Sequence, residues 1–221
     1  MKALEKGVTF RIAGTQQYYH TYHDFGFILS AKEVGVAAPK TELLDVPGAD
    51  APLDFTEFFG DIKYKNRKLK FTLSKAGIST EFLDLFSEIQ NALNGKLCEI
   101  VLDEDDLFYY RGRVTISSFK KDKRIGECVI DCDCEPYKMK VLATRLSYTI
   151  AGNRVISLPN LRKHVVPSFS TDAEVQIKYD RKIFTGNGDF IIPDLVLKKD
   201  ITKIEVFGNA TVKIEYREGS L

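Results

Sequence analysis

The residues best suited to metal or redox chemistry in this chain are three closely spaced cysteines, Cys128, Cys132 and Cys134. In an extended strand they would share one face, because side chains alternate between faces and all three positions are even-numbered. Such a strand separates the backbones of Cys128 and Cys134 by about 20 Å, whereas zinc needs thiolates that converge to about 2.3 Å from one point. One metal ion therefore cannot collect all three, and we expect them and Cys98 to be buried as small hydrophobic residues.

Two polar clusters are further candidates for binding. The acidic run at 103–106 offers the oxygen ligands that hard cations prefer, but it lacks the central glycine and closing glutamate of a calcium loop. We interpret it as a solvated hairpin tip, which could dock a basic patch on a neighbouring subunit.

His20 and His23 lie in a tyrosine-rich segment without helical periodicity. We expect a surface loop or edge strand there, suited to an interface rather than to a metal.

Sequence patterns for catalysis are missing. The chain has no G-x-S-x-G elbow, no phosphate-binding loop and no H-E-x-x-H, and Gly186-Asn187-Gly188 lacks the rest of a dinucleotide fingerprint. No nucleophile is near His164, the third histidine, in the sequence. We therefore predict no catalytic residue, no metal ligand and no cofactor. The enzymatic alternative is a hydrolase of two β-domains with paired carboxylates in a cleft.

Composition argues against several other classes of protein, namely nucleic-acid-binding, membrane-inserted and secreted proteins. With 221 residues, 44% of them hydrophobic, the chain can form one large or two modest packed domains. Its 32 basic and 31 acidic residues give a formal net charge of +1, so no bulk field attracts nucleic acid or an anionic membrane. No apolar run reaches the roughly 18 residues that span a bilayer, and Glu5 and Lys6 interrupt any signal-peptide core. We expect neither nucleic-acid binding nor membrane insertion, and synthesis in a cytoplasm.

Most of the first two thirds of the chain is predicted to be β-strand, from period-two alternation and β-branched or aromatic residues. The expected strands are residues 8–12, 27–30, 68–73, 97–102, 108–117, 127–134 and 139–148. One segment, residues 80–94, instead places Phe82, Phe86, Ile89 and Leu93 at helical spacing and is followed by Gly95 as a C-cap. We expect the apolar stripe of this helix to cover one face of the sheet.

After about Leu146 the pattern changes. Gly152-Asn153, Pro159-Asn160 and Pro167 are typical of a domain junction. Beyond them we expect short strands at 173–179, 189–192, 203–207 and 211–216, with turns at 186–188 and 208–209. This pattern indicates a small β-sandwich.

The segment 46–73 joins an irregular stretch to an alternating strand. Pro47, Gly48 and Pro52 interrupt regular structure, whereas apolar and polar residues alternate from Arg67 onwards. We expect residues 45–61 to protrude as an arm. Its apolar anchors at a subunit interface would be Leu53, Phe55, Phe58 and Phe59. The alternative is that these side chains fold back under their own domain.

The order of these motifs resembles that of siphophage distal tail proteins, the Dit family. The motifs are DFGFIL at 24–29, the Pro-Gly turn, the acidic and aromatic arm, YKNR at 64–67, DCDCEPYKMKV at 131–141 and the closing EYREGSL. The resemblance implies a mainly β protein, in which residues 1–145 form a ring-forming N-terminal β-sandwich with one packed α-helix. Residues 146–221 would form a smaller galectin-like β-sandwich. The chain departs from the family most in RVISLPNLRKHVVPSF, where a turn richer in Gly and Asn is expected.

The resemblance also implies a structural function. A Dit protein forms a hexameric ring in the tail tip of a long-tailed phage or prophage, and it connects the tail tube to the baseplate hub. The implied partners are sister copies, the tail tube protein, the tail hub or tail-associated lysin, and receptor-binding proteins; the implied location is the virion tail tip, after synthesis in the host bacterial cytoplasm. The alternative is a carbohydrate-binding module-like protein that adheres to host cell-surface glycans. Because the chain has no Trp to stack on a sugar, we favour a C-terminal sandwich that is not a lectin.

Overall fold

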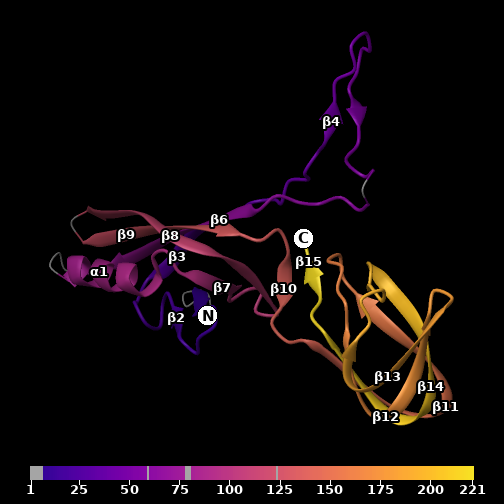
Figure 1. Ribbon diagram of the computed structural model, residues 1–221. Helices are drawn as coiled ribbons and strands as arrows, with labels where there is room; N and C mark the ends of the chain where they lie inside the picture. The colour runs from indigo at the N-terminus through magenta and orange to yellow at the C-terminus, as the bar shows by residue number, and fades with distance from the viewer. Residues whose placement is uncertain (1–6, 59, 78–80, 123) are drawn as a thin grey trace. The chain divides into compact units, whose positions relative to one another are not determined.

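The computed structural model describes residues 7–58, 60–77, 81–122 and 124–221 (Figure 1). The chain divides into two compact units, Met1–Pro136 and Tyr137–Leu221. The boundary predicted between residues 145 and 146 falls inside strand β11 (Thr144–Asn160) of the second unit. Gly152-Asn153 and Pro159-Asn160, which sequence analysis places at a junction, also lie inside this strand.

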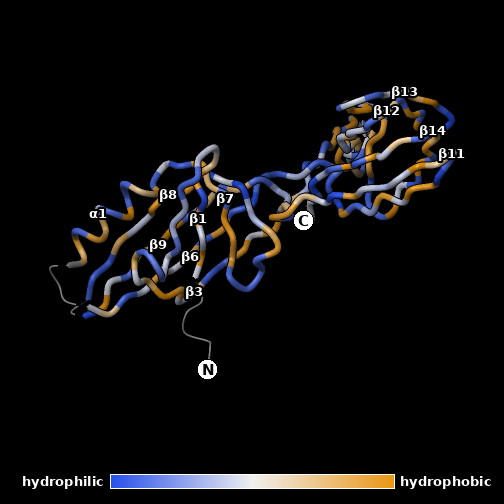
Figure 2. The backbone as a smooth tube through the Cα atoms, turned by 90° about the horizontal axis from the view of Figure 1, so that it is seen from below, coloured by the Kyte–Doolittle hydropathy of each residue, from blue (hydrophilic) through white to orange (hydrophobic). Residues whose placement is uncertain are grey.

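The first unit is an antiparallel sheet with the strand order β2-β1-β7-β8-β9-β6-β3. Its strands are β1 (Val8–Ile12), β2 (Tyr18–His20), β3 (Ile28–Val34), β6 (Arg67–Ala76), β7 (Leu97–Leu102), β8 (Phe108–Asp122) and β9 (Ile125–Cys134). The predicted alternation is clear in β6, where Leu69, Phe71 and Leu73 are buried while Lys68 and Lys70 are exposed. Figure 2 shows the same alternation of hydrophobic and hydrophilic residues along the strands.

Helix α1 (Glu81–Leu93) lies in the predicted segment, whose first residue, Thr80, is outside the described residues. Ile89 and Leu93 are buried in the core of the sheet. Gly95 has a φ of +75°, a conformation that suits glycine after a helix, and its N–H donates to the carbonyl of Val114 at 2.8 Å. Phe82 lies against Gly126 of β9, where an added Cβ would be 2.6 Å from the ring. The helix therefore packs on the sheet as the sequence predicts.

The second unit contains a four-stranded sheet with the order β11-β14-β12-β13. Its further strands are β12 (Ser168–Tyr179), β13 (Lys182–Ile191) and β14 (Asp200–Tyr216), and two short strands, β10 (Lys138–Lys140) and β15 (Gly219–Ser220), pair with each other. Buried residues of the long strands, among them Ile156, Phe169 and Ile214, form a second hydrophobic core. The predicted fold class, mainly β with one packed helix, is confirmed.

Two turns predicted for this unit are wrong. Residues 186–188 lie inside β13, and the chain reverses instead at Asp180 and Arg181, which have φ values of 45° and 65°. Gly208 lies inside β14, opposite Gly152 of β11, and both glycines have positive φ. A paired glycine in each strand allows both strands to bend and continue, whereas a single glycine read from sequence indicates a turn.

The C-terminal residues are held by a buried carboxylate. Glu218 is 4% exposed and accepts hydrogen bonds from Lys140 Nζ at 2.5 Å and Thr144 Oγ1 at 2.6 Å. The neighbouring Arg217 donates from Nη1 to the carbonyls of Lys140 and Val141 at 2.6 and 2.5 Å. These charge-assisted bonds fix the chain after β14 against the segment that precedes β11.

All four cysteines are buried and free, as the sequence predicts. Burial raises the pKa of the Cys98 and Cys128 thiols to about 11 and that of Cys134 to about 12. The pKa of Cys132 is raised further, by burial first and then by the neighbouring Cys134, Cys98 and Asp131. The reactive thiolate is thus disfavoured at each position.

Thiol labelling should therefore report unfolding. At pH 8 we expect the four thiols of the folded chain to react with a disulfide reagent at least about a thousand-fold more slowly than those of the denatured chain. The free energy of unfolding should also fall as the pH rises from 9 to 11, because unfolded thiols with the ordinary pKa of 9.0 lose their protons before the folded ones do. Rapid stoichiometric labelling of the folded chain would contradict this burial.

Candidate assembly surface

The arm predicted at residues 45–61 is the outer part of a long hairpin between β3 and β6. The hairpin continues beyond the sheet through backbone hydrogen bonds from Gly35 N to Lys68 O, Lys65 N to Ala38 O and Lys40 N to Lys63 O, at 2.7–2.8 Å. Two short strands, β4 (Leu43–Leu44) and β5 (Leu53–Asp54), pair with each other further out. Figure 1 shows this hairpin leaving the sheet as a separate projection.

Local polar contacts give the hairpin its shape. Asp54 Oδ1 accepts from the Thr56 N–H at 2.8 Å, and hydrogen bonds from Thr56 lower the pKa of this carboxyl. Thr56 Oγ1 accepts from the Glu42 N–H at 3.1 Å, while the Phe55 N–H donates to the Glu42 carbonyl at 2.8 Å. The strand that carries Leu53 is thereby tied to the strand that carries Leu43 and Leu44.

The apolar side chains of the hairpin are exposed. Leu53 is 52% exposed and Phe58 is 70% exposed. Phe55 is half-buried, and its ring lies edge-on to the Phe58 ring at 5.6 Å. None of these three residues belongs to either hydrophobic core, so they do not fold back under their own domain. Phe59, the fourth predicted anchor, lies outside the described residues.

Two further residues belong to this surface although they were not predicted from the sequence: Leu43 and Leu44, which are 58% and 54% exposed. The two adjacent leucines of TELLDVP are apolar residues in a polar stretch and could have indicated an interaction surface. They lie before residue 45, where the arm was predicted to start. In the structure, Leu44 is the register partner of Leu53. We call the set Leu43, Leu44, Leu53, Phe55 and Phe58 the arm patch; large apolar side chains gathered on one exposed segment mark an interaction surface.

The histidine cluster differs from the prediction. β2 is an edge strand, as expected, but His20 is 7% exposed rather than on the surface. Its Nδ1 accepts from the N–H groups of Tyr22 and His23 at 3.2 and 3.1 Å, which places the proton on Nε2. Nε2 then donates to Asp103 Oδ2 at 3.1 Å. This contact is structural: it joins the last residue of β2 to the loop after β7.

The acidic run is a hairpin tip, as predicted, between β7 and β8. Two of its side chains are nevertheless engaged within the unit. Asp103 Oδ2 also accepts from the Gly7 N–H at 2.7 Å, and Glu104 forms an ion pair with Lys32 of β3. The segment is thus less free to dock a neighbour than its sequence suggests.

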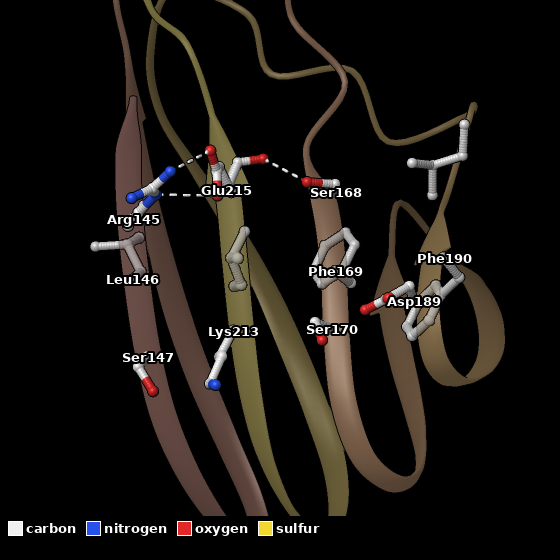
Figure 3. Close-up of a pocket in the computed structure, with 12 residues that line it drawn as sticks. Arg145, Leu146, Ser147, Ser168, Phe169, Ser170, Asp189, Phe190, Lys213 and Glu215 are labelled. Atoms are coloured by element: carbon white, nitrogen blue, oxygen red, sulfur yellow. Dashed lines mark hydrogen bonds and ion pairs between the residues drawn. The ribbon is translucent and has the colours of Figure 1, made fainter. Parts of the chain in front are cut away.

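In the described part of the chain, no group of three or more His, Cys, Asp or Glu residues could hold a metal ion. No helix among the same residues is long and apolar enough to cross a membrane. An open trough of about 630 Å³ lies on the sheet of the second unit (Figure 3). The arm patch and this trough are both surface features that could bind a partner.

Comparison with known proteins identifies the fold. No protein-family model and no curated protein sequence matches the chain. Among solved structures, however, the fold is that of a phage adsorption-hub protein. One similar structure is the crystal structure of the SPP1 Dit protein (gp 19.1), described as a paradigm of the hub adsorption apparatus in phages that infect Gram-positive bacteria. The TM-score is 0.66, with 12% sequence identity, over 95% of this chain and 98% of that chain. The resemblance to the Dit family is therefore confirmed at the level of the fold, over nearly the whole length.

Proposed function

We propose that the protein is a structural component of the tail tip of a long-tailed phage or prophage. Six copies would form a ring that connects the tail tube protein to the baseplate hub, to a tail-associated lysin and to receptor-binding proteins. The observation that carries this proposal is the shared fold with a hub protein over both units of the chain.

The arm patch supports the assembly role. A closed ring needs a heterologous interface, in which one face of each subunit meets a different face of the next. A hairpin that extends beyond its own sheet and exposes Leu53 and Phe58 is suited to one half of such an interface. The sheet also ends in edge strands β2 and β3, whose backbone groups can pair with a neighbouring chain.

The oligomeric mass of the purified full chain tests the ring. Light scattering after size-exclusion chromatography should give six times the 25.0 kDa mass of the chain, and negative-stain microscopy should show closed rings. A chain that stays monomeric up to high micromolar concentration would contradict a self-assembling ring. An open filament would contradict closure, because a heterologous contact that fails to close gives helical polymers.

A further inference from the structure

The hairpin between β3 and β6 carries its charges in two separate stretches of sequence. Residues 41–61 contain six carboxylates and no Lys or Arg, whereas residues 62–70 contain five basic residues and no carboxylate. The six carboxylates, which we call the arm carboxylates, belong to Glu42, Asp45, Asp50, Asp54, Glu57 and Asp61. Because the whole chain has a formal net charge of only +1, this separation is a local property of the hairpin.

The structure converts this separation in sequence into a separation in space. Asp45 and Asp50 lie in the loop that connects β4 to β5, at the outer end of the hairpin (Figure 1). The exposed lysines lie at the inner end, where the hairpin joins the sheet and Gly35 N donates to Lys68 O at 2.8 Å. These lysines, which we call the root lysines, are Lys40, Lys63, Lys65, Lys68 and Lys70. The paired strands β4 and β5 keep the outer loop away from the root of its own hairpin.

The charged side chains of both stretches are on the surface. All six arm carboxylates and all five root lysines are exposed. Within the described chain, the root lysines form no ion pair and no side-chain hydrogen bond, and the same is true of Asp45, Asp50 and Glu57. These charges are therefore available for contacts between molecules.

Apolar surface accompanies the charges at both ends of the hairpin. The arm patch lies among the arm carboxylates, and its Leu53 and Phe58 are 52% and 70% exposed. Val36, one residue beyond Gly35 at the root, is 89% exposed. One end thus combines carboxylates with apolar side chains, and the other combines ammonium groups with an apolar side chain. Such surfaces complement each other in charge and in hydrophobicity.

This distribution of charge selects the orientation of two copies. An arm-to-arm contact would place carboxylates against carboxylates, and a root-to-root contact would place lysines against lysines. Only an arm that meets the root of another copy brings opposite charges together. That contact joins two different faces, so it is heterologous, as a closed ring requires.

We propose that the arm carboxylates of each copy dock against the root lysines of the next copy, with the arm patch against Val36. The inference rests on the ring proposed above and names the surface that receives the arm. Each copy gives its arm to one neighbour and offers its root to the other. Opposite charges at every contact then set the direction in which the copies follow one another.

Two charge-reversed chains test this contact. The arm-reversed chain carries Glu42→Lys, Asp45→Lys, Asp50→Lys and Glu57→Lys, which changes the charge of the arm carboxylate set from −6 to +2. The root-reversed chain carries Lys40→Glu, Lys63→Glu, Lys65→Glu and Lys68→Glu, which changes the root lysine set from +5 to −3. Each chain alone should need at least about a hundredfold higher concentration than the natural chain to form a ring, because its contacts lose their attraction or become repulsive. Light scattering provides the measurement.

An equimolar mixture of the two reversed chains should restore the hexamer. Its reversed arms meet reversed roots and its natural arms meet natural roots when the two chains alternate, and a ring of six copies permits alternation. An affinity tag on one chain should recover both in equal amounts. The matched control carries Lys96→Glu, Lys120→Glu, Lys198→Glu and Lys199→Glu, four exposed lysines outside the hairpin, and should assemble as the natural chain does.

The natural chain provides a second measurement that depends on no variant. Assembly of rings from monomers should slow at least tenfold between about 0.1 M and about 1 M salt, because the Debye length falls from about 10 Å to about 3 Å. A rate that does not change with salt would contradict an electrostatic contact.

A hexamer formed by either reversed chain alone would overturn the proposal, because the arm carboxylates or the root lysines would then face another component. A mixture that stays monomeric while the natural chain forms hexamers would overturn it as well. Both results leave the ring itself intact, whereas a natural chain that stays monomeric overturns the ring and this contact together. Thermal unfolding midpoints of the reversed chains should agree with the natural midpoint within a few degrees, because every changed side chain is exposed.

Discussion

The double variant Leu53→Ser, Phe58→Ser is expected to be a folded monomer at concentrations where the natural chain forms the proposed ring. Both side chains are more than half exposed in the isolated chain, so their replacement removes little packing from the subunit itself. In a ring they would be buried against a neighbour, and burial of one large apolar side chain is worth about 1.5–3 kcal/mol. Two such losses at each of six interfaces should remove the ring, as measured by light scattering.

A matched control separates the arm patch from general surface hydrophobicity. Leu142 is 79% exposed and lies in the second unit, so Leu142→Ser should leave the oligomeric mass unchanged. The thermal unfolding midpoints of all these variants should agree within a few degrees, because exposed substitutions rarely change stability by more than about 0.5 kcal/mol. A double variant that still elutes as a hexamer would remove the arm patch from the interface.

The features of the first unit that could be predicted from sequence depend on local patterns. Alternation in Lys68–Leu73 specifies which face of β6 is buried, and the spacing of Phe82, Ile89 and Leu93 specifies the helix. The protrusion of Leu53 and Phe58 was also predictable, because the flanking prolines and Gly48 interrupt any ladder that would return these residues to the core. Periodicity and backbone breakers act within a few residues, and a single sequence displays them directly.

Other features depend on residues that are distant in the chain. The buried His20 ring donates a hydrogen bond to Asp103, which is 83 residues away in the chain. Gly208 bends a strand rather than ending it because Gly152 lies opposite. The trough is lined by residues from four separate strands, so no single motif marks it. In each case the decisive contact is set by strand register, which local sequence does not encode.

Strand register also predicts that a side chain added at Gly112 lowers stability strongly, although the φ of this glycine is not positive. Gly112 of β8 lies between Cys98 of β7 and Cys134 of β9 in one row of the sheet. A Cβ at this position would lie 2.4 Å from Cys134 Sγ and 2.6 Å from the carbonyl oxygen of Asp133. The thiol could rotate, but the carbonyl belongs to the backbone of a paired strand. Any side chain at position 112 must therefore displace β9 or break the ladder.

Gly112→Val should accordingly lower the free energy of unfolding by about 3 kcal/mol or more, at the upper end of the cost of overpacking. That loss is a large part of the roughly 5–15 kcal/mol that stabilises a typical domain. Circular dichroism during urea denaturation provides the measurement, and thiol labelling at pH 8 provides a second one, because opening of this row exposes Cys98 and Cys134. Thr115→Val is the matched control, since it adds a valine to an exposed position of the same strand and should leave both readings unchanged. A Gly112→Val chain with the natural midpoint would mean that β8 and β9 do not approach as closely as their register requires.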